Sequence, residues 1–280
     1  MSNLAKRIAS AAVLLPLVTF LVLRGPAWSI GLLLVFFAFL AGFELASFSC
    51  AGRPLWVRIS VSLFCALTAA AVALAFAEPA APLVALLAIA PSSLLLFLFT
   101  AREPSASTAH AACAALGATY CGALLGSISL LYPISSLSWP LAGPIPDTGR
   151  TWILLLLLGI VASDTFAYAF GRIFGKRKLA PRISPGKTWA GAFGGVLGTV
   201  VAVALFKLTA LPELGWWEVA ALGVPLSIVG QLGDLAESLL KRGFSVKDSG
   251  NLIPGHGGVL DRLDALMFGA PVVLLYSLVR

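Results

Sequence analysis

The sequence predicts an all-α protein, a polytopic transmembrane helical bundle of about nine spans. Three features predict this class: the composition, the spacing of apolar runs and the distribution of positive charge. Hydrophobic residues make up 59% of the 280 residues and charged residues only 11%, whereas about 25% of an average soluble domain is charged. A soluble fold of this length covers its core with charged side chains, and this chain has too few. The composition therefore excludes an ordinary soluble enzyme.

Apolar runs of membrane-spanning length recur along the whole chain. A spanning helix needs about 20 apolar residues, because unpaired backbone groups cannot be left in hydrocarbon. Runs of this kind lie near residues 8–24, 27–49, 57–77, 80–100, 109–131, 151–171, 188–210, 217–239 and 263–279. Lys6 and Arg7 precede the first run, but no small-x-small cleavage site follows it. We therefore expect the first helix to be retained.

The positive charges test this span count, because a wrong count would scatter them over both sides of the membrane. On this assignment all 19 Lys and Arg residues fall on one side except Arg24, Arg150, Lys207 and Arg280. The N-terminus is therefore predicted to be cytoplasmic and the C-terminus external. The net charge of +7 lies in short loops rather than on one soluble face, so anionic lipid and phosphate ligands are expected and nucleic acid is not.

The segment 132–150 is rich in proline, glycine and serine and separates two halves of different chemistry. We expect it to be an external connector between two domains. Domain 1–131 holds about five N-terminal transmembrane helices. Domain 151–280 holds catalytic transmembrane helices with two cytoplasmic loops. Glu44 is the carboxylate found within the first five spans, and its role, structural or functional, is open.

Carboxylates inside the later spans are candidates for chemistry. An ionisable side chain at mid-helix costs about 2.5 to 3.5 kcal/mol and by default indicates function or pairing. Asp164 and Asp234 each lie about two turns before a basic residue, Arg172 and Lys241 respectively. Both are thus expected at shallow depth on the cytoplasmic side, lining one polar cavity. The alternative is that each is a structural partner of a basic residue on a neighbouring helix.

Two helices present acidic residues at regular spacing. Asp234, Glu237 and Ser238 share a helix face through i, i+3 and i+4 spacing, and Asp261 and Asp264 repeat the i, i+3 spacing at the start of the last span. Carboxylates that converge from two helices make a hard-oxygen site suited to Mg²⁺, which completes its shell with waters and substrate phosphates. Carboxylates near lipid, with basic loops beside them, suggest phosphate chemistry.

The loop between these helices, KRGFSVKDSGNLIPGHGGVLDRLD, combines glycine, base and acid. Its glycines allow the backbone to approach a ligand closely. A basic loop alone is equally consistent with a topology signal or a lipid-headgroup contact, but interleaved acid serves neither purpose. The basic residues are Lys241, Arg242, Lys247 and Arg262, and the acidic residues are Asp248, Asp261 and Asp264. His256 has no His or Cys neighbour for zinc, so we expect it to hydrogen-bond a phosphate or nucleotide.

The other cytoplasmic loop, GRIFGKRKLAPRISPGKTWAG, contains GKT at 186–188, which looks like the end of a Walker A motif. The likeness is superficial, because that motif needs glycine where Pro181 stands and a strand before the loop. We expect instead a basic loop that holds phosphate through Ser184, Lys187 and Thr188.

Residues 238–264, SLLKRGFSVKDSGNLIPGHGGVLDRLD, resemble the signature of the phosphatidate cytidylyltransferases, or CDP-diglyceride synthases. That signature has the form S-x-x-K-R-x4-K-D-x-[GSA] followed by H-G-G-x-x-D-R-x-D, and this chain meets it at every fixed position. The resemblance extends through DTFAYAFGRIFGKRKLAPRISPGKTW and GQLGDLAES. Ala190 departs from it, because family members often carry Glu or Gln after KTW.

The resemblance implies a Mg²⁺-dependent reaction in which phosphatidic acid and CTP give CDP-diacylglycerol and pyrophosphate. Asp234 and Asp261 match acidic positions of the metal centre, where a monovalent cation such as K⁺ beside Mg²⁺ is an open alternative, and Lys241 matches a basic position beside it. Catalytic roles are expected for Lys241, Asp248, Asp264 and Asp164. Substrate-binding roles are expected for Ser184, Lys187, Thr188, Ser238, Arg242, Lys247, His256 and Arg262.

The expected partners are CTP, phosphatidic acid and the lipid bilayer, with a homodimer left open. We expect a location in a bacterial cytoplasmic membrane, with the active site facing the cytoplasm. One alternative function is a CTP-dependent lipid-alcohol kinase, in which CTP donates its γ-phosphate. The alternative of another class is an ion-coupled membrane transporter, which would spread its carboxylates across the membrane depth, whereas here they cluster at one face.

Overall fold

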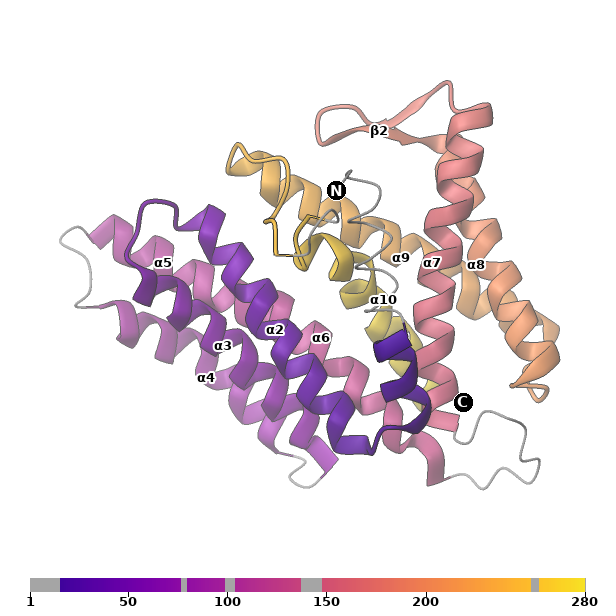
Figure 1. Cartoon of the computed structure of the whole chain (residues 1–280), viewed down its shortest axis with the longest axis horizontal. Helices are drawn as coiled ribbons and strands as arrows, with labels where there is room; N and C mark the ends of the chain where they lie inside the picture. The colour runs from indigo at the N-terminus through magenta and orange to yellow at the C-terminus, as the bar shows by residue number, and fades with distance from the viewer. Residues whose placement is uncertain (1–15, 77–79, 99–103, 137–147, 253–256, 280) are drawn as a thin grey trace. The chain divides into compact units, whose positions relative to one another are not determined.

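The computed structural model describes residues 16–76, 80–98, 104–136, 148–252 and 257–279, which are mainly helical (Figure 1). Residues 16–24 form a helix that precedes the named elements. In order, these are α2 (Ala27–Ser49), α3 (Leu55–Ala73), the 3-10 turn η1 (Leu74–Phe76), α4 (Ala81–Phe97), α5 (Pro104–Gly117), the π-helical η2 (Ala118–Ala123), α6 (Leu124–Gly126), the 3-10 helix η3 (Ser127–Ser136), α7 (Thr148–Phe174), β1 (Lys178–Ala180), β2 (Ser184–Thr188), α8 (Trp189–Thr209), α9 (Trp216–Gly243) and α10 (Leu260–Val279).

Among the described residues, 7 helical stretches are long and apolar enough to cross a membrane. They are Trp28–Ser49, Leu55–Ala73, Pro104–Tyr132, Gly149–Phe174, Trp189–Thr209, Trp216–Gly243 and Leu260–Val279. α4 is apolar but has only 17 residues, and most of the predicted span 8–24 lies outside the described residues. The all-α transmembrane fold is thus confirmed, while the count of about nine spans and the cytoplasmic N-terminus stay predictions.

The helices expose large apolar side chains to their surroundings. Leu67, Leu87 and Leu95 are 67%, 69% and 68% exposed, respectively. Many large apolar side chains exposed to this degree are rare on soluble monomers, because water disfavours them. Hydrocarbon tails solvate such side chains without this cost, so the chain is an integral membrane protein.

The chain forms two compact units, which are described separately. Unit 1 comprises Met1–Leu130 and Phe244–Leu263, and unit 2 comprises Leu131–Gly243 and Asp264–Arg280. The loop after α9 thus groups with the N-terminal helices, and the unit boundary falls inside the first turns of α10. The predicted division into 1–131, 132–150 and 151–280 stays a prediction, and residues 137–147 of the expected connector lie outside the described residues.

Unit 1 is held together by small residues between its helices. α2 packs along α3, and a Cβ atom at Gly42 would lie 2.5 Å from the Cys65 Sγ atom. The π-helical η2 also packs on α3, where a Cβ at Gly122 would lie 2.6 Å from the Cys65 carbonyl oxygen. Close approach of backbones replaces hydrophobic driving force in membranes. Within this apolar packing, α2 carries Glu44, which is 2% exposed.

Unit 2 is built on the α7 and α8 pair, which packs along its length, with α9 against both. Gly194 and Gly198 of α8, one turn apart, meet α7: a Cβ at Gly194 would lie 2.5 Å from the Phe170 Cβ, and one at Gly198 would lie 2.6 Å from the Ala162 carbonyl oxygen. This small-xxx-small pattern allows the two helices to approach closely. It holds α7 and α8 close together, and both helices line the cavity described below.

A short β-hairpin joins α7 to α8 (Figure 1). β1 and β2 pair antiparallel with Lys178 opposite Thr188 and Ala180 opposite Ser184. The sequence analysis described this segment only as a basic loop. Strand formers are sparse in SPGKT, which contains proline and glycine, so the hairpin depends on its backbone pairing rather than on propensity. β2 runs directly into α8, which brings Lys187 and Thr188 to the first turn of that helix.

Candidate active site

A cavity of ≈ 500 Å³ lies within unit 2, between α7, the hairpin, the start of α8 and the middle of α9. α7 contributes Asp164, Tyr168 and Arg172 to its wall, and α9 contributes Gln231 and Asp234. The hairpin and the first turn of α8 contribute Gly186, Lys187 and Thr188. Carboxylates and cations therefore face one space, as the sequence analysis expected for Asp164 and Asp234.

The α7 wall of the cavity carries both signs of charge. Asp164, Tyr168 and Arg172 follow one another at i, i+4 and i+8, so they share one face of the helix. The Arg172 Nη1 atom donates a hydrogen bond to the Tyr168 hydroxyl at 3.3 Å. Both side chains are exposed, so this weak contact leaves the guanidinium able to turn toward a ligand.

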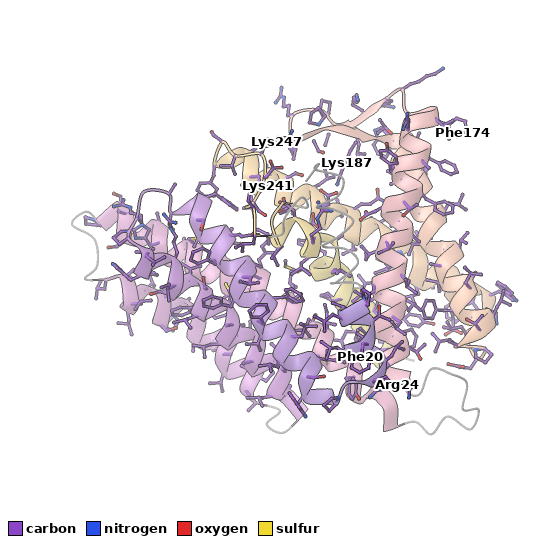
Figure 2. The ribbon with its side chains drawn as sticks, in the orientation of Figure 1. Phe20, Arg24, Phe174, Lys187, Lys241 and Lys247 are labelled. Carbon is purple, nitrogen blue, oxygen red and sulfur yellow. The ribbon has the colours of Figure 1, made fainter. Side chains whose placement is uncertain are left out.

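Lys187 of the hairpin, labelled in Figure 2, forms an ion pair with Asp234 of α9. The Lys187 Nζ atom lies 2.8 Å from the Asp234 Oδ2 atom and donates to the Gln231 carbonyl oxygen at 3.4 Å. The two side chains are 23% and 39% exposed, and ion pairs with this much solvent access contribute little to stability. Either partner can therefore exchange the other for a substrate phosphate or a cation.

Thr188, Ser184 and Arg242 contact backbone or strand neighbours within unit 2. Thr188 is 5% exposed, and its hydroxyl oxygen accepts a hydrogen bond from the Gly191 N–H at 3.1 Å, which caps α8. Ser184 is half-buried in β2 opposite Ala180. Arg242, at the end of α9, donates from Nε to the Ile183 carbonyl oxygen at 3.3 Å and so ties that helix to the hairpin turn. Their predicted substrate roles stay predictions.

On α9, the two acidic residues of the predicted shared face, Asp234 and Glu237, contact different side chains. The Ser238 hydroxyl donates to Asp234 Oδ1 at 3.5 Å. One turn on, the Lys241 Nζ atom lies 2.8 Å from the Glu237 Oε2 atom. Glu237 is 1% exposed and Lys241 9%. This buried pair holds the Lys241 ammonium inside the protein, and the predicted catalytic role of Lys241 stays a prediction.

Asp264 is the acidic residue that α10 contributes to unit 2. It is 7% exposed and accepts a hydrogen bond from the Ala265 N–H at 2.8 Å. It lies within electrostatic reach of Asp234 and Asp164. The part of the chain that the structure describes contains no group of three or more His, Cys, Asp or Glu side chains that could hold a metal ion. Hard-oxygen donors are thus gathered here without forming a closed protein cage.

The remaining predicted residues belong to unit 1. Asp261 Oδ2 accepts hydrogen bonds from the Ser249 N–H at 3.2 Å, the Ser249 hydroxyl at 2.9 Å and the Gly258 N–H at 3.0 Å. Three further residues are exposed: Lys247, Asp248 and Arg262. His256 lies outside the described residues. Because Asp234 and Asp261 belong to different units, their predicted pairing at one metal ion stays a prediction.

Gln231, Tyr168 and Arg172 were not among the predicted site residues. Arg172 was noted only as a basic residue after Asp164, although the i, i+4, i+8 spacing of Asp164, Tyr168 and Arg172 places all three on one face. Gln231 precedes Asp234 by three residues and donates from Nε2 to the Ala192 carbonyl oxygen at 3.2 Å and to the Ser227 hydroxyl at 3.0 Å. Helical spacing from Asp164 and from Asp234 was the sequence signal that could have identified these three cavity-lining residues.

Comparison with known proteins identifies the family of this chain. The model of the cytidylyltransferase family matches residues 5–279. The chain belongs to the cytidylyltransferase family. Its relatives include the phosphatidate cytidylyltransferase of Brucella abortus biovar 1 (strain 9-941), 48% identical over 144 residues, or 51% of this chain and 53% of the relative. That of Bacillus subtilis (strain 168) is 46% identical over 123 residues, or 44% of this chain and 46% of the relative. The chain thus spans about half the length of the curated relatives that it matches.

Proposed function

We propose that this member of the cytidylyltransferase family is a phosphatidate cytidylyltransferase, which transfers the CMP moiety of CTP to phosphatidic acid. The observation that carries the proposal is the unit 2 cavity, in which Asp164, Asp234, Lys187 and Arg172 face one space. The signature within residues 238–264 and the printed name of the relatives support the same reaction.

The reaction joins two polyanions and needs no general base. A phosphate monoester has a second pKa of about 6, so the lipid phosphate is largely dianionic at neutral pH and already nucleophilic. One of its oxygens attacks the α-phosphorus of CTP in line. The bond between the α-phosphorus and the bridging oxygen to the β-phosphate breaks, and pyrophosphate leaves with the electron pair. Charge repulsion between the substrates is then the main obstacle.

The cavity supplies positive charge against this repulsion. Lys187 can leave Asp234 for a phosphate oxygen, because their ion pair is only partly buried. Arg172 presents a planar fork of donors that matches a phosphate. Its hydrogen bond to Tyr168, at 3.3 Å and exposed, leaves the guanidinium able to turn toward that phosphate.

The acidic residues of the cavity fit a hard divalent cation. Asp234 already holds a cation, the Lys187 ammonium, at 2.8 Å, and Asp164 lines the same wall. Mg²⁺ is commonly held by one or two carboxylates, with waters and substrate phosphates as its other ligands, so a closed protein cage is not needed. We expect Asp234 and Asp261 to be carboxylate ligands of Mg²⁺. Bound there, the ion would supply positive charge against the phosphate oxygens.

The proposal puts the cavity at the cytoplasmic face of a bacterial cytoplasmic membrane. The hairpin beside it carries Lys176, Arg177, Lys178 and Arg182, and such clusters remain on the cytoplasmic side. CTP then enters from the cytosol. The acyl chains of phosphatidic acid stay in the leaflet while its phosphate moves sideways between the helices.

Product analysis with the purified full chain tests this function. Labelled CTP and phosphatidic acid in detergent with Mg²⁺ should release pyrophosphate and yield a cytidine-containing lipid. Lys187→Met should lower kcat/KM for CTP by about 30-fold, because it removes one phosphate-binding charge. Lys176→Met, an exposed lysine outside the cavity wall, is the matched control and should stay near the wild-type value.

Three outcomes contradict the proposal. CDP release with a phosphorylated lipid alcohol would indicate the kinase reaction. Ion flux in proteoliposomes without CTP, and without any lipid product, would indicate a transporter. Equal losses for Lys187→Met and Lys176→Met would remove the cavity from the reaction.

A further inference from the structure

Glu44 is a buried carboxylate that the proposed reaction leaves without a role. It lies on α2, is 2% exposed, and adjoins Leu45 and Ala46, which are 0% exposed. A carboxylate in such surroundings costs several kcal/mol unless hydrogen bonds compensate it. Its partners therefore indicate why a charged residue stands in a membrane helix.

One oxygen of Glu44 joins the two ends of the signature loop within unit 1. The Oε2 atom accepts a hydrogen bond from the Leu260 N–H at 2.8 Å and another from the Ser249 hydroxyl at 3.1 Å. Ser249 follows Asp248 of the signature, and Leu260 is the first residue of α10. Both partners are more than 200 residues away along the chain, so these contacts belong to tertiary structure.

Ser249 contacts both Glu44 and Asp261, and so links their positions. Its N–H and hydroxyl both lie within hydrogen-bond distance of Asp261 Oδ2, at 3.2 Å and 2.9 Å. A hydroxyl has one hydrogen, so it donates to Glu44 or to Asp261 at any moment while it stays in contact with both. The Gly258 N–H fixes the same Asp261 oxygen at 3.0 Å. Glu44, Ser249 and Asp261 thus form one connected group at the start of α10.

Two glycines of the signature are shaped to this carboxylate. A Cβ atom at Gly250 would lie 2.5 Å from Glu44 Oε1, and one at Gly258 would lie 2.5 Å from Glu44 Oε2. Such distances are below any real contact of a Cβ, so a side chain at either position would displace the loop or Glu44. These glycines are therefore needed for close approach of the loop backbone to Glu44, apart from any contact with a ligand.

We propose that Glu44 is a positioning residue, which fixes the loop ends (249–250 and 257–261) and, through Ser249, the carboxylate of Asp261. The role rests on the proposed function, in which Asp261 holds Mg²⁺. Oε1 accepts no hydrogen bond from any residue in the described ranges, so the loop uses one acceptor oxygen of Glu44. A glutamine can supply that oxygen, whereas alanine or leucine cannot.

Hydrogen exchange of the full chain in detergent tests the proposal without relying on activity. In Glu44→Ala, the Leu260 amide loses its acceptor, and Asp261, the acceptor of the Gly258 amide, is no longer held through Ser249 and Glu44. Peptides over 257–263 should therefore exchange about 10-fold faster. Glu44→Gln should exchange like wild type. Ser47→Ala is the matched control, because Ser47 lies one turn on along α2 and its hydroxyl bonds the Phe43 carbonyl of the same helix.

Turnover gives the second readout. Glu44→Ala should lower kcat by about 100-fold, because a misplaced catalytic group costs that much, and KM for CTP should change much less. Glu44→Gln should keep kcat within about fivefold of wild type, because the amide oxygen accepts the same hydrogen bonds. If Glu44→Ala does not fold, Ser249→Ala breaks the same link from the loop side and should also speed exchange and lower kcat.

Two results would overturn the positioning role. Glu44→Gln that is as inactive as Glu44→Ala, with wild-type exchange, would mean that the charge itself is needed. Wild-type exchange at 257–263 in both Glu44→Ala and Ser249→Ala would mean that Glu44 does not hold the loop. Failure of the cytidylyl reaction itself would appear in the wild-type protein and would leave the exchange result intact.

Discussion

The acidic residues of the two units are stabilised in different ways. In unit 2, Asp234 and Glu237 are paired with lysine side chains, Lys187 and Lys241. In unit 1, Glu44 and Asp261 are held by backbone N–H groups and the hydroxyl of Ser249. A lysine side chain can move away and let a carboxylate take another cation, whereas backbone donors fix a carboxylate in place. The partly exposed pair of Lys187 and Asp234 can thus exchange partners, whereas the hydrogen bonds of unit 1 fix the positions of Glu44 and Asp261.

The largest effect is expected at Asp234. Asp234→Asn keeps the shape of the side chain but removes the charge that binds Lys187 and, in the proposed reaction, Mg²⁺. Turnover should fall by about 1000-fold, as for loss of a principal electrostatic group, and should not recover at any Mg²⁺ concentration. Initial rates over a Mg²⁺ titration measure this.

Glu213→Gln is the matched control for that variant, because Glu213 is a surface carboxylate in the turn between α8 and α9. It should behave like wild type. Near-normal turnover in Asp234→Asn would contradict this comparison of the two units, because Asp234 would then not be the carboxylate that exchanges Lys187 for a metal ion.

The next effect concerns stability and separates the two pairs within unit 2. Lys241→Met leaves the Glu237 carboxylate, 1% exposed, without its ammonium partner and should lower the free energy of unfolding by about 3 kcal/mol. The midpoint of thermal unfolding in detergent measures this. Adding Glu237→Gln should restore much of the loss, because the uncompensated charge is then gone.

Lys187→Met should shift that midpoint far less, because its ion pair is partly exposed. If Lys241→Met instead keeps wild-type stability and loses only turnover, then Lys241 contacts substrate, as the sequence analysis expected, and the buried pair is not its main role.

The smallest effect is expected at Thr188. Thr188→Ala removes the cap that accepts from Gly191 and should cost about 1 kcal/mol of stability, while Thr188→Ser should retain it. Thr209→Ala is the control, because the Thr209 hydroxyl is exposed near the other end of α8 and bonds the Leu205 carbonyl of the same helix. Thermal unfolding and turnover should be measured together. A large loss of turnover at unchanged stability would show that the Thr188 hydroxyl binds substrate, as the sequence pattern suggested.

The sequence predicted the placement of side chains where spacing along one helix was sufficient. Asp164 and Asp234 were expected to line one cavity, and both do. The face shared by Asp234 and Ser238 is also found. The partners of these groups were harder to predict. Lys187 was expected to bind phosphate, and the structure adds its pair with Asp234, because 47 residues of chain separate them and only helix packing brings them together.

The sequence by itself determined that the chain is an all-α membrane protein with a cytidylyltransferase signature. Composition, the length of apolar runs and contiguous motifs are local properties, and local properties can be read along the chain. Only the tertiary structure decided what each charged group touches. Glu44 had no company within its own span, yet its carboxylate binds Ser249 and Leu260 near the other end of the chain. Buried charges take whichever donors packing brings within about 3 Å, and packing depends on every helix at once.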